Sequence, residues 1–135
     1  SFFSQLEYIR PRVYYADGAS GAYVESLNSE FASPYLIISD FRAYATMTRQ
    51  YCEAASRRGL PLLLITDFYC TWARDYPIDL LQIKTDVQQF WDAWSPLVCL
   101  QNLFLSAVVE RLGPSLDDRL AKNKELQREL GQFEP

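Results

Sequence analysis

The fold is decided by the stretch Tyr35-Leu-Ile-Ile-Ser-Asp-Phe-Arg-Ala-Tyr-Ala-Thr-Met-Thr48, in which four apolar residues run into a polar turn and a helix-like segment follows. This pattern is typical of a buried parallel strand that ends in a loop at the ligand-facing edge of a sheet. A second copy follows, Leu60-Pro-Leu-Leu-Leu-Ile-Thr-Asp67, which is again an apolar run that closes on polar groups. Two such strands with a helix between them predict a βαβ unit and therefore an α/β fold with a parallel sheet.

Composition narrows the class of protein. The 135 residues predict a single domain over 1–135, and 49% hydrophobic residues are enough for a real core. The net charge of −4 makes the chain a poor nucleic-acid binder by itself. Its three widely spaced cysteines favour a reducing, cytoplasmic compartment over a disulfide framework. The absence of histidine excludes a histidine-dependent triad and the usual kind of zinc site.

The spacing of apolar residues along the chain predicts the remaining helices and strands. Helices are expected at 1–10, 23–31, 43–58, about 90–112 and 116–130, with a kink or fresh start at Pro96. Strands are expected at 12–17, 35–39, 61–66 and 79–84, the last with the alternation of an edge strand. Residues 71–75 read as one helical turn, and Gly59 reads as the C-terminal cap of the preceding helix. The apolar run 98–109 is too short to span a bilayer, and no membrane contact is expected.

The chain opens in a helix where a doubly wound sheet normally has its first strand. We therefore expect this first strand to be missing and the sequence to be a fragment of a longer protein.

Three motifs carry a resemblance to a known family. They are residues 36–48 as quoted above, Gly59-Leu-Pro-Leu-Leu-Leu-Ile-Thr-Asp67, and Thr85-Asp-Val-Gln-Gln-Phe-Trp-Asp92 before the long apolar helix. Their order and spacing over residues 11–112 resemble the sugar isomerase (SIS) domain, and within it the effector domain of RpiR-type bacterial transcription regulators. The resemblance implies a flavodoxin-like three-layer αβα sandwich with a parallel sheet, usually as a homodimer. It also implies a DNA-binding helix-turn-helix domain upstream of Ser1.

The resemblance implies a ligand as well, a phosphorylated sugar or related metabolite at the carboxyl ends of the strands. Carried over to this sequence, the ligand-binding residues are Asp40, Arg42, Tyr44, Thr46, Thr48, Asp67 and Gln88. The loop in the first motif departs from the family pattern, since Asp40 stands for a hydroxyl and Ala45 for a serine. A carboxylate at about 4 Å from a phosphate costs roughly 4 kcal/mol at an effective dielectric of 20, which Arg42 offsets by pairing with the phosphate or with Asp40.

Other residues permit two interpretations each. Asp67 either binds a ligand hydroxyl or caps the short helix that follows. Cys70 is expected to be a bystander thiol, and Cys52 and Cys99 are expected to be buried. The charged helix 116–130 is expected to present a solvated face or to contact a partner. Six aromatic residues are expected in the core or an interface, or else around a ligand: Phe68, Tyr69, Trp72, Phe90, Trp91 and Trp94.

The leading functional hypothesis is a non-catalytic sensor, an effector-binding and dimerisation domain that needs no cofactor or metal. A dimerisation module with a vestigial pocket is the main alternative, favoured by Asp40, Ala45 and Val87. A sugar-phosphate isomerase is the third, with Asp40, Asp67 or Asp86 as its base.

Overall fold

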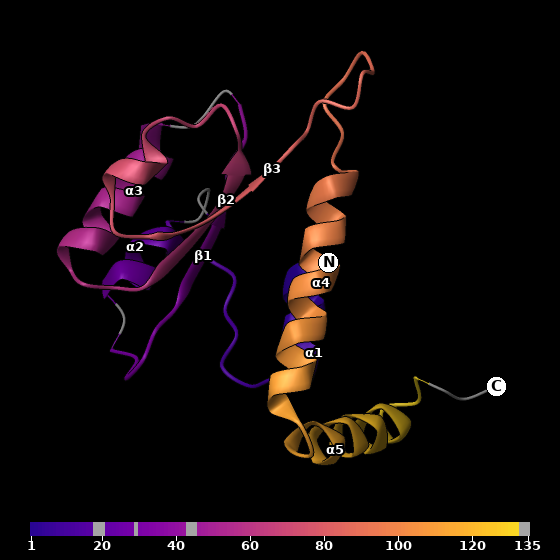
Figure 1. Ribbon diagram of the computed structural model, residues 1–135. Coiled ribbons are helices and arrows are strands. Elements are labelled where there is room, and N and C mark those ends of the chain that lie inside the picture. The colour runs from indigo at the N-terminus through magenta and orange to yellow at the C-terminus, as the bar shows by residue number, and fades with distance from the viewer. Residues whose placement is uncertain (18–20, 29, 43–45, 133–135) are drawn as a thin grey trace. The chain divides into compact units, whose positions relative to one another are not determined.

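The computed structural model of the chain describes residues 1–17, 21–28, 30–42 and 46–132 (Figure 1). Its contacts divide the chain into two compact units. We call residues 16–96 the sheet unit and residues 1–15 with 97–135 the helical unit. The expectation of a single domain over 1–135 stays a prediction.

The sheet unit is built on three parallel strands. These are β1 (Leu36–Ser39), β2 (Leu62–Asp67) and β3 (Asp79–Ile83), in the order β1-β2-β3. Leu36 pairs with Leu62, and Leu63 pairs with Asp79. The predicted α/β class with a parallel sheet is therefore confirmed, together with the strands expected at 35–39, 61–66 and 79–84.

The central strand is β2, and every one of its six residues is buried. A continuous run of branched apolar residues is what a parallel strand covered on both faces requires. In β3, exposed and half-buried residues alternate at first, and this strand lies at an edge of the sheet as predicted.

Helix α3 (Thr46–Arg57) connects β1 to β2 and completes the βαβ unit. Its buried residues, Thr48, Cys52 and Ala55, recur at helical spacing and form one stripe. Cys52 and Ala55 pack in one apolar cluster with Leu62 and Leu64 of β2. The core of the sheet unit therefore lies between α3 and one face of the sheet.

Gly59 ends α3 as predicted. Its φ of 67° is left-handed, a conformation that glycine adopts without steric cost. The amide of Leu60 donates to the Ala55 carbonyl at 3.0 Å, and the amide of Gly59 donates to the Ser56 carbonyl at 3.1 Å. This pair of bonds is the Schellman arrangement, which turns the chain back towards β2.

Helix α2 (Ala22–Asn28) lies beside α3 on the same face of the sheet (Figure 1). The hydroxyls of Ser26 and Tyr51 are 2.6 Å apart, and Leu27 packs against the core cluster. The helix is shorter than the predicted 23–31. The predicted α/β arrangement, a parallel sheet flanked by helices, is confirmed in the described residues.

The connection from β2 to β3 holds a single 3-10 turn, η1 (Ala73–Asp75), within the helical turn predicted at 71–75. Ala73 is buried in the core cluster, so this turn covers part of the sheet that a longer helix covers in most parallel crossovers.

The strand predicted at 12–17 was wrong. Residues 13–17 have no regular structure, and Tyr14 and Tyr15 are 66% and 69% exposed. Arg12 takes a left-handed φ of 59°, which breaks the extended path of a strand. The apolar run indicated a strand, but a strand also needs a neighbour with which to pair its backbone.

The helical unit contains α1 (Phe2–Ile9), α5 (Ser115–Glu129) and most of α4 (Ser95–Leu112). The predicted start near residue 90 was wrong, because α4 begins at Ser95. The fresh start expected at Pro96 agrees with this boundary, since a proline ring suits the first helical turn. Cys99 is exposed rather than buried. Since α4 is apolar nearly all round, its composition does not indicate which side is covered.

None of the helices in the described ranges combines the length and apolar character that a membrane span needs.

Helix α5 caps the end of α1. Arg119 donates to the carbonyl of Glu7 at 2.8 Å and to that of Tyr8 at 3.1 Å. Asn123 donates to the same Tyr8 carbonyl at 2.9 Å, and the Tyr8 hydroxyl donates to Gln127 at 3.2 Å. These side chains satisfy carbonyls that the last turn of α1 leaves without an intrahelical partner.

Candidate functional site

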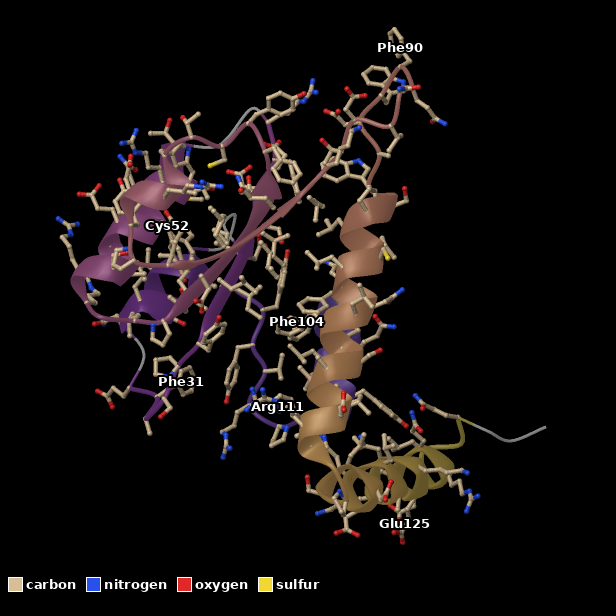
Figure 2. The ribbon with its side chains drawn as sticks, viewed as in Figure 1. Phe31, Cys52, Phe90, Phe104, Arg111 and Glu125 are labelled. Carbon is tan, nitrogen blue, oxygen red and sulfur yellow. The ribbon has the colours of Figure 1, made fainter. Side chains whose placement is uncertain are left out.

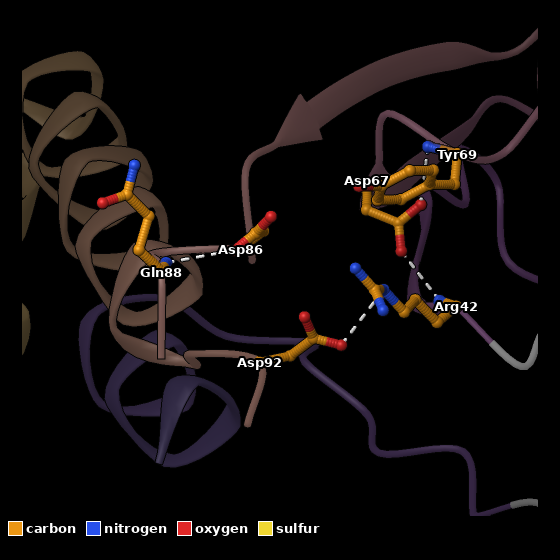
Figure 3. Close-up of polar contacts among 6 residues, drawn as sticks. All are labelled: Arg42, Asp67, Tyr69, Asp86, Gln88 and Asp92. Carbon is orange, nitrogen blue, oxygen red and sulfur yellow. Dashed lines mark hydrogen bonds and ion pairs between the residues drawn. The ribbon is translucent and has the colours of Figure 1, made fainter. Parts of the chain in front are cut away.

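The candidate site lies at the carboxyl edge of the sheet. Residue Ser39 of β1 pairs with Ile65 of β2, so the loops that follow these two strands begin side by side. Asp67, the last residue of β2, is 1% exposed. Its Oδ2 accepts from the amide of Arg42 at 2.7 Å, and its Oδ1 accepts from the amide of Tyr69 at 2.9 Å (Figure 3). One buried carboxylate therefore ties the β1 loop to the β2 loop.

The structure decides against one of the two roles predicted for Asp67, the capping of the short helix η1. The residue before η1 is Trp72, so Asp67 does not cap that helix. It forms instead a tight turn onto its own loop, through Tyr69, and a bond across to Arg42. Direct contact of Asp67 with a ligand hydroxyl stays a prediction.

The backbone of Arg42 is left-handed, with a φ of 44°. A residue with a side chain adopts this region at a cost, and such residues concentrate at ligand-binding and switching segments. The bond from its amide to Asp67 holds the conformation in place. Arg42 is therefore presented by the fold at a defined position.

Among the described residues, Asp92 and Tyr69 contact the guanidinium of Arg42. Its Nε lies 3.1 Å from Oδ2 of Asp92, and its Cζ lies 4.8 Å from the centre of the Tyr69 ring (Figure 3). A cation between an aromatic face and a carboxylate is stabilised by both. The sequence suggested Asp40 or a phosphate as the partner of Arg42, and the structure supplies Asp92.

A hollow of about 240 Å³ opens beside Asp67. Its walls come from the ends of β2 and β3 and the residues that follow: Asp67, Phe68, Tyr69, Ile83, Lys84, Thr85 and Asp86. Thr85 is 2% exposed, and its hydroxyl has no hydrogen-bond partner among the described residues. A buried hydroxyl without a partner is uncommon in native proteins and calls for a physical reason.

The other residues predicted to bind ligand are more scattered. Asp40 is half-buried, and its amide extends the β1–β2 ladder by donating to Ile65. Thr46 is exposed at the start of α3, whereas Thr48 is buried with the core residues of that helix. Gln88 is exposed in the loop after β3, on the far side of Asp92 from Arg42 (Figure 3). Tyr44 lies outside the described residues. The structure brings Arg42 and Asp67 together, and it places Gln88 away from them.

The aromatic residues do not form one cluster in the described structure. Trp72 packs against the core and lies edge-on to Tyr76. Trp94 lies edge-on to Phe41, with ring centres 5.4 Å apart. Phe90 is 90% exposed at the tip of its loop (Figure 2). The core placement is therefore confirmed for Trp72, whereas the others are more than half exposed: Phe68, Tyr69, Phe90, Trp91 and Trp94.

The cysteines offer no reactive thiolate at the site. Cys70 is buried, and this burial raises the pKa of its thiol. Burial also raises the pKa of the Cys52 thiol to about 11. Both groups are protonated near neutral pH and behave as small apolar residues. In the part of the chain that the structure describes, no three His, Cys, Asp or Glu side chains gather as a metal site.

Two residues of the site were not predicted, Asp92 and Thr85. Both belong to the third motif, but 50 positions separate Asp92 from Arg42, and no local pattern pairs them. The signal for Thr85 was its place just after the predicted strand 79–84, which is comparable with the place of Asp67 at the end of its strand.

Comparisons with known proteins show a likeness in fold and none in sequence family. No protein-family model matches the chain, and no curated protein matches it in sequence. Among solved structures, the chain is similar to the sugar isomerase domain in the crystal structure of an RpiR transcription factor from Sphaerobacter thermophilus. The TM-score is 0.70 at 21% sequence identity, over 94% of this chain and 69% of that chain. With three parallel strands in its described residues, the chain has the α/β fold of a SIS domain, with fewer strands than the full domain.

Proposed function

We propose that this chain is the effector-sensing and dimerisation domain of a DNA-binding transcription regulator. The observation that carries the proposal is the Arg42 guanidinium, which the fold presents at the carboxyl edge of a SIS-type sheet. The ligand is a phosphorylated sugar or a related anionic metabolite, held by Arg42 through charge-assisted hydrogen bonds. Contact with DNA falls to a separate domain of a cytoplasmic regulator, since this chain carries 13 Lys and Arg against 17 Asp and Glu.

A sensing role fits the chemistry of the site better than catalysis does. Isomerisation of a sugar phosphate needs a base that can take a proton from the substrate. Both carboxylate oxygens of Asp67 already accept backbone hydrogen bonds, and Asp86 accepts one from Gln88 at 3.0 Å. Both carboxylates therefore hold the loop backbone, and the chain has no histidine that could act as the base instead.

The vestigial-pocket module remains a second candidate because Asp92 already occupies the anion position on Arg42. In that case the ion pair is a permanent structural contact, and the chain contributes only dimerisation.

Thermal unfolding against a panel of sugar phosphates separates the two candidates. A ligand at 100 times its dissociation constant adds about 2.7 kcal/mol of stability, which is a clear shift of the midpoint. Arg42→Ala should abolish the shift, whereas Arg57→Ala removes an equal charge from the exposed end of α3 and should leave it intact. No shift with any compound would reject the sensor and favour the dimerisation module.

Dimerisation is tested separately by light scattering at micromolar concentration. A mass of about 31 kDa is expected for a dimer, twice the 15.6 kDa of the chain. Trp94 is 57% exposed immediately before α4, and Trp94→Ala should lower the dimer fraction if this region forms the interface. A monomeric mass for the unmodified chain would remove dimerisation from the proposal.

A further inference from the structure

The anion position on Arg42 is filled by a residue of the same chain. The Arg42–Asp92 ion pair is 3.1 Å long, and the side chains are 49% and 31% exposed. A partly exposed pair of this kind contributes little stability, and an external anion competes with it readily. Asp92 is thus a carboxylate held where a ligand oxyanion would bind.

Asp92 belongs to a loop whose two ends are joined by a backbone hydrogen bond. The amide of Ala93 donates to the carbonyl of Thr85 at 2.8 Å, so residues 86–92 leave the end of β3 and return to one point. Inside this 86–92 loop, Gln88 has a left-handed φ of 59°, supported by the bond from its amide to Asp86. The tip carries Phe90, which is 90% exposed (Figure 2), and the next residue, Trp91, is 78% exposed. The Arg42–Asp92 pair is a contact through which this loop is held to the β1 end.

The point where the loop closes contains the hydroxyl of Thr85, for which the described residues supply no hydrogen-bond partner. Its carbonyl is engaged by Ala93, while its hydroxyl is buried at the wall of the hollow. An unsatisfied buried hydroxyl destabilises the arrangement that buries it. A rearrangement that admits water or a ligand group to Thr85 relieves this cost, so two independent features favour release of the 86–92 loop.

We propose that Asp92 is an internal stand-in for the anionic group of the effector, and that ligand binding exchanges one for the other. A phosphate or carboxylate on the ligand takes the place of Asp92 on Arg42, and the 86–92 loop is released. Because α4 begins at Ser95, only three residues after Asp92, the release is passed directly to the start of that helix. This inference rests on the proposed anion site, and it adds how occupancy of that site changes the protein.

The first arm of the test uses the full chain without ligand. Asp92→Asn removes the charge from the pair and keeps the side-chain volume. Asp86→Asn is the matched control, since it removes a charge from the same loop and its amide oxygen can still accept from Gln88. Hydrogen exchange at the Ala93 amide reports closure of the loop. Exchange should be faster in Asp92→Asn by about one and a half to fivefold, the range of an exposed ion pair, and unchanged in Asp86→Asn.

The second arm adds inorganic phosphate or acetate, with ionic strength held constant by sodium chloride. Either oxyanion should speed exchange at Ala93 in the unmodified chain and have no effect in Arg42→Ala. Phosphate should also bind Asp92→Asn more tightly than the unmodified chain, by a similar factor. An effect of phosphate alone would assign the ligand a phosphate group, and an effect of acetate alone would assign it a carboxylate.

Two results would overturn the proposal that a ligand anion replaces Asp92 on Arg42. One is equal Ala93 exchange in Asp92→Asn and the unmodified chain. The other is faster exchange in Asp92→Asn that neither oxyanion reproduces in the unmodified chain. The proposed function fails separately, when no metabolite raises the unfolding midpoint although inorganic oxyanions still release the loop.

Discussion

Replacing Asp67 by asparagine should destabilise the chain through the backbone bonds that this carboxylate accepts. The residue is 1% exposed, with Oδ2 at 2.7 Å from the Arg42 amide and Oδ1 at 2.9 Å from the Tyr69 amide. An asparagine side chain can keep one of these bonds through its oxygen, but its NH₂ group then faces the other amide, donor against donor. One charge-assisted bond is lost, which costs about 1.5–3 kcal/mol.

The tight turn onto Tyr69 is local, so we expect the Asp67→Asn variant to keep that bond and to lose the one to Arg42. The left-handed backbone of Arg42, with its φ of 44°, then loses its support. Anion binding should therefore weaken together with stability. Asp67→Ala removes both bonds and should be more damaging, in a chain whose total stability is expected to be on the order of 5–15 kcal/mol.

Urea unfolding followed by circular dichroism measures the change in the free energy of unfolding. A loss of about 1.5–3 kcal/mol corresponds to a fall in the thermal midpoint of roughly 5–15 °C for a chain of this size. The matched control is Asp86→Asn, because Asp86 is exposed and accepts a single backbone bond, from Gln88. A free energy of unfolding for Asp67→Asn within about 0.5 kcal/mol of the unmodified chain would refute this account of Asp67.

Two further predictions concern contacts away from the site. Arg119→Ala removes part of the capping of α1, through the bonds to the carbonyls of Glu7 and Tyr8, and should cost about 1–2 kcal/mol with faster amide exchange in α1; unchanged exchange there would contradict the capping role. Tyr35→Phe removes the 2.6 Å bond from the tyrosine hydroxyl to Asp79 and should cost about 0.5–1.5 kcal/mol. Burial and this bond raise the pKa of Tyr35 from 10.0 to about 12, so its contribution is complete below pH 10 and is lost as the pH rises towards 12. The difference between Tyr35→Phe and the unmodified chain in urea unfolding should therefore shrink as the pH rises from about 10 towards 12, and a constant difference would contradict the pKa shift.

Much of the sheet unit could be predicted because its signals are local. The apolar runs that end before Asp40 and Asp67 predicted two buried parallel strands, and both exist. Gly59 predicted the end of α3 because only a residue that tolerates positive φ suits that position. The prediction at 12–17 failed because pairing with a neighbouring strand is not a local property. Residues Val13-Tyr-Tyr15 have the composition of a strand, but no strand lies beside them among the described residues.

The candidate site was harder to predict than the sheet. Arg42 and Asp67 were identified from their places after the strands, and the structure joins them through a backbone amide rather than through their side chains. Asp92 could not be assigned to Arg42, because the pairing depends on how the 86–92 loop folds back. The side-chain direction of Gln88 likewise depends on its left-handed backbone, which its sequence context does not specify.

The capping of α1 by α5 has a consequence for synthesis of the protein. The two helices meet through bonds such as that from Arg119 to Tyr8, which spans 111 positions of the chain. At about 5–20 residues per second, a ribosome needs roughly 6–20 s to add the residues between them. During this interval the nascent α1 carries two consecutive phenylalanines, Phe2 and Phe3, without the helix that later holds it. All residues of the sheet unit are synthesised before that helix, so α1 waits for its capping side chains longer than the sheet waits for its last strand.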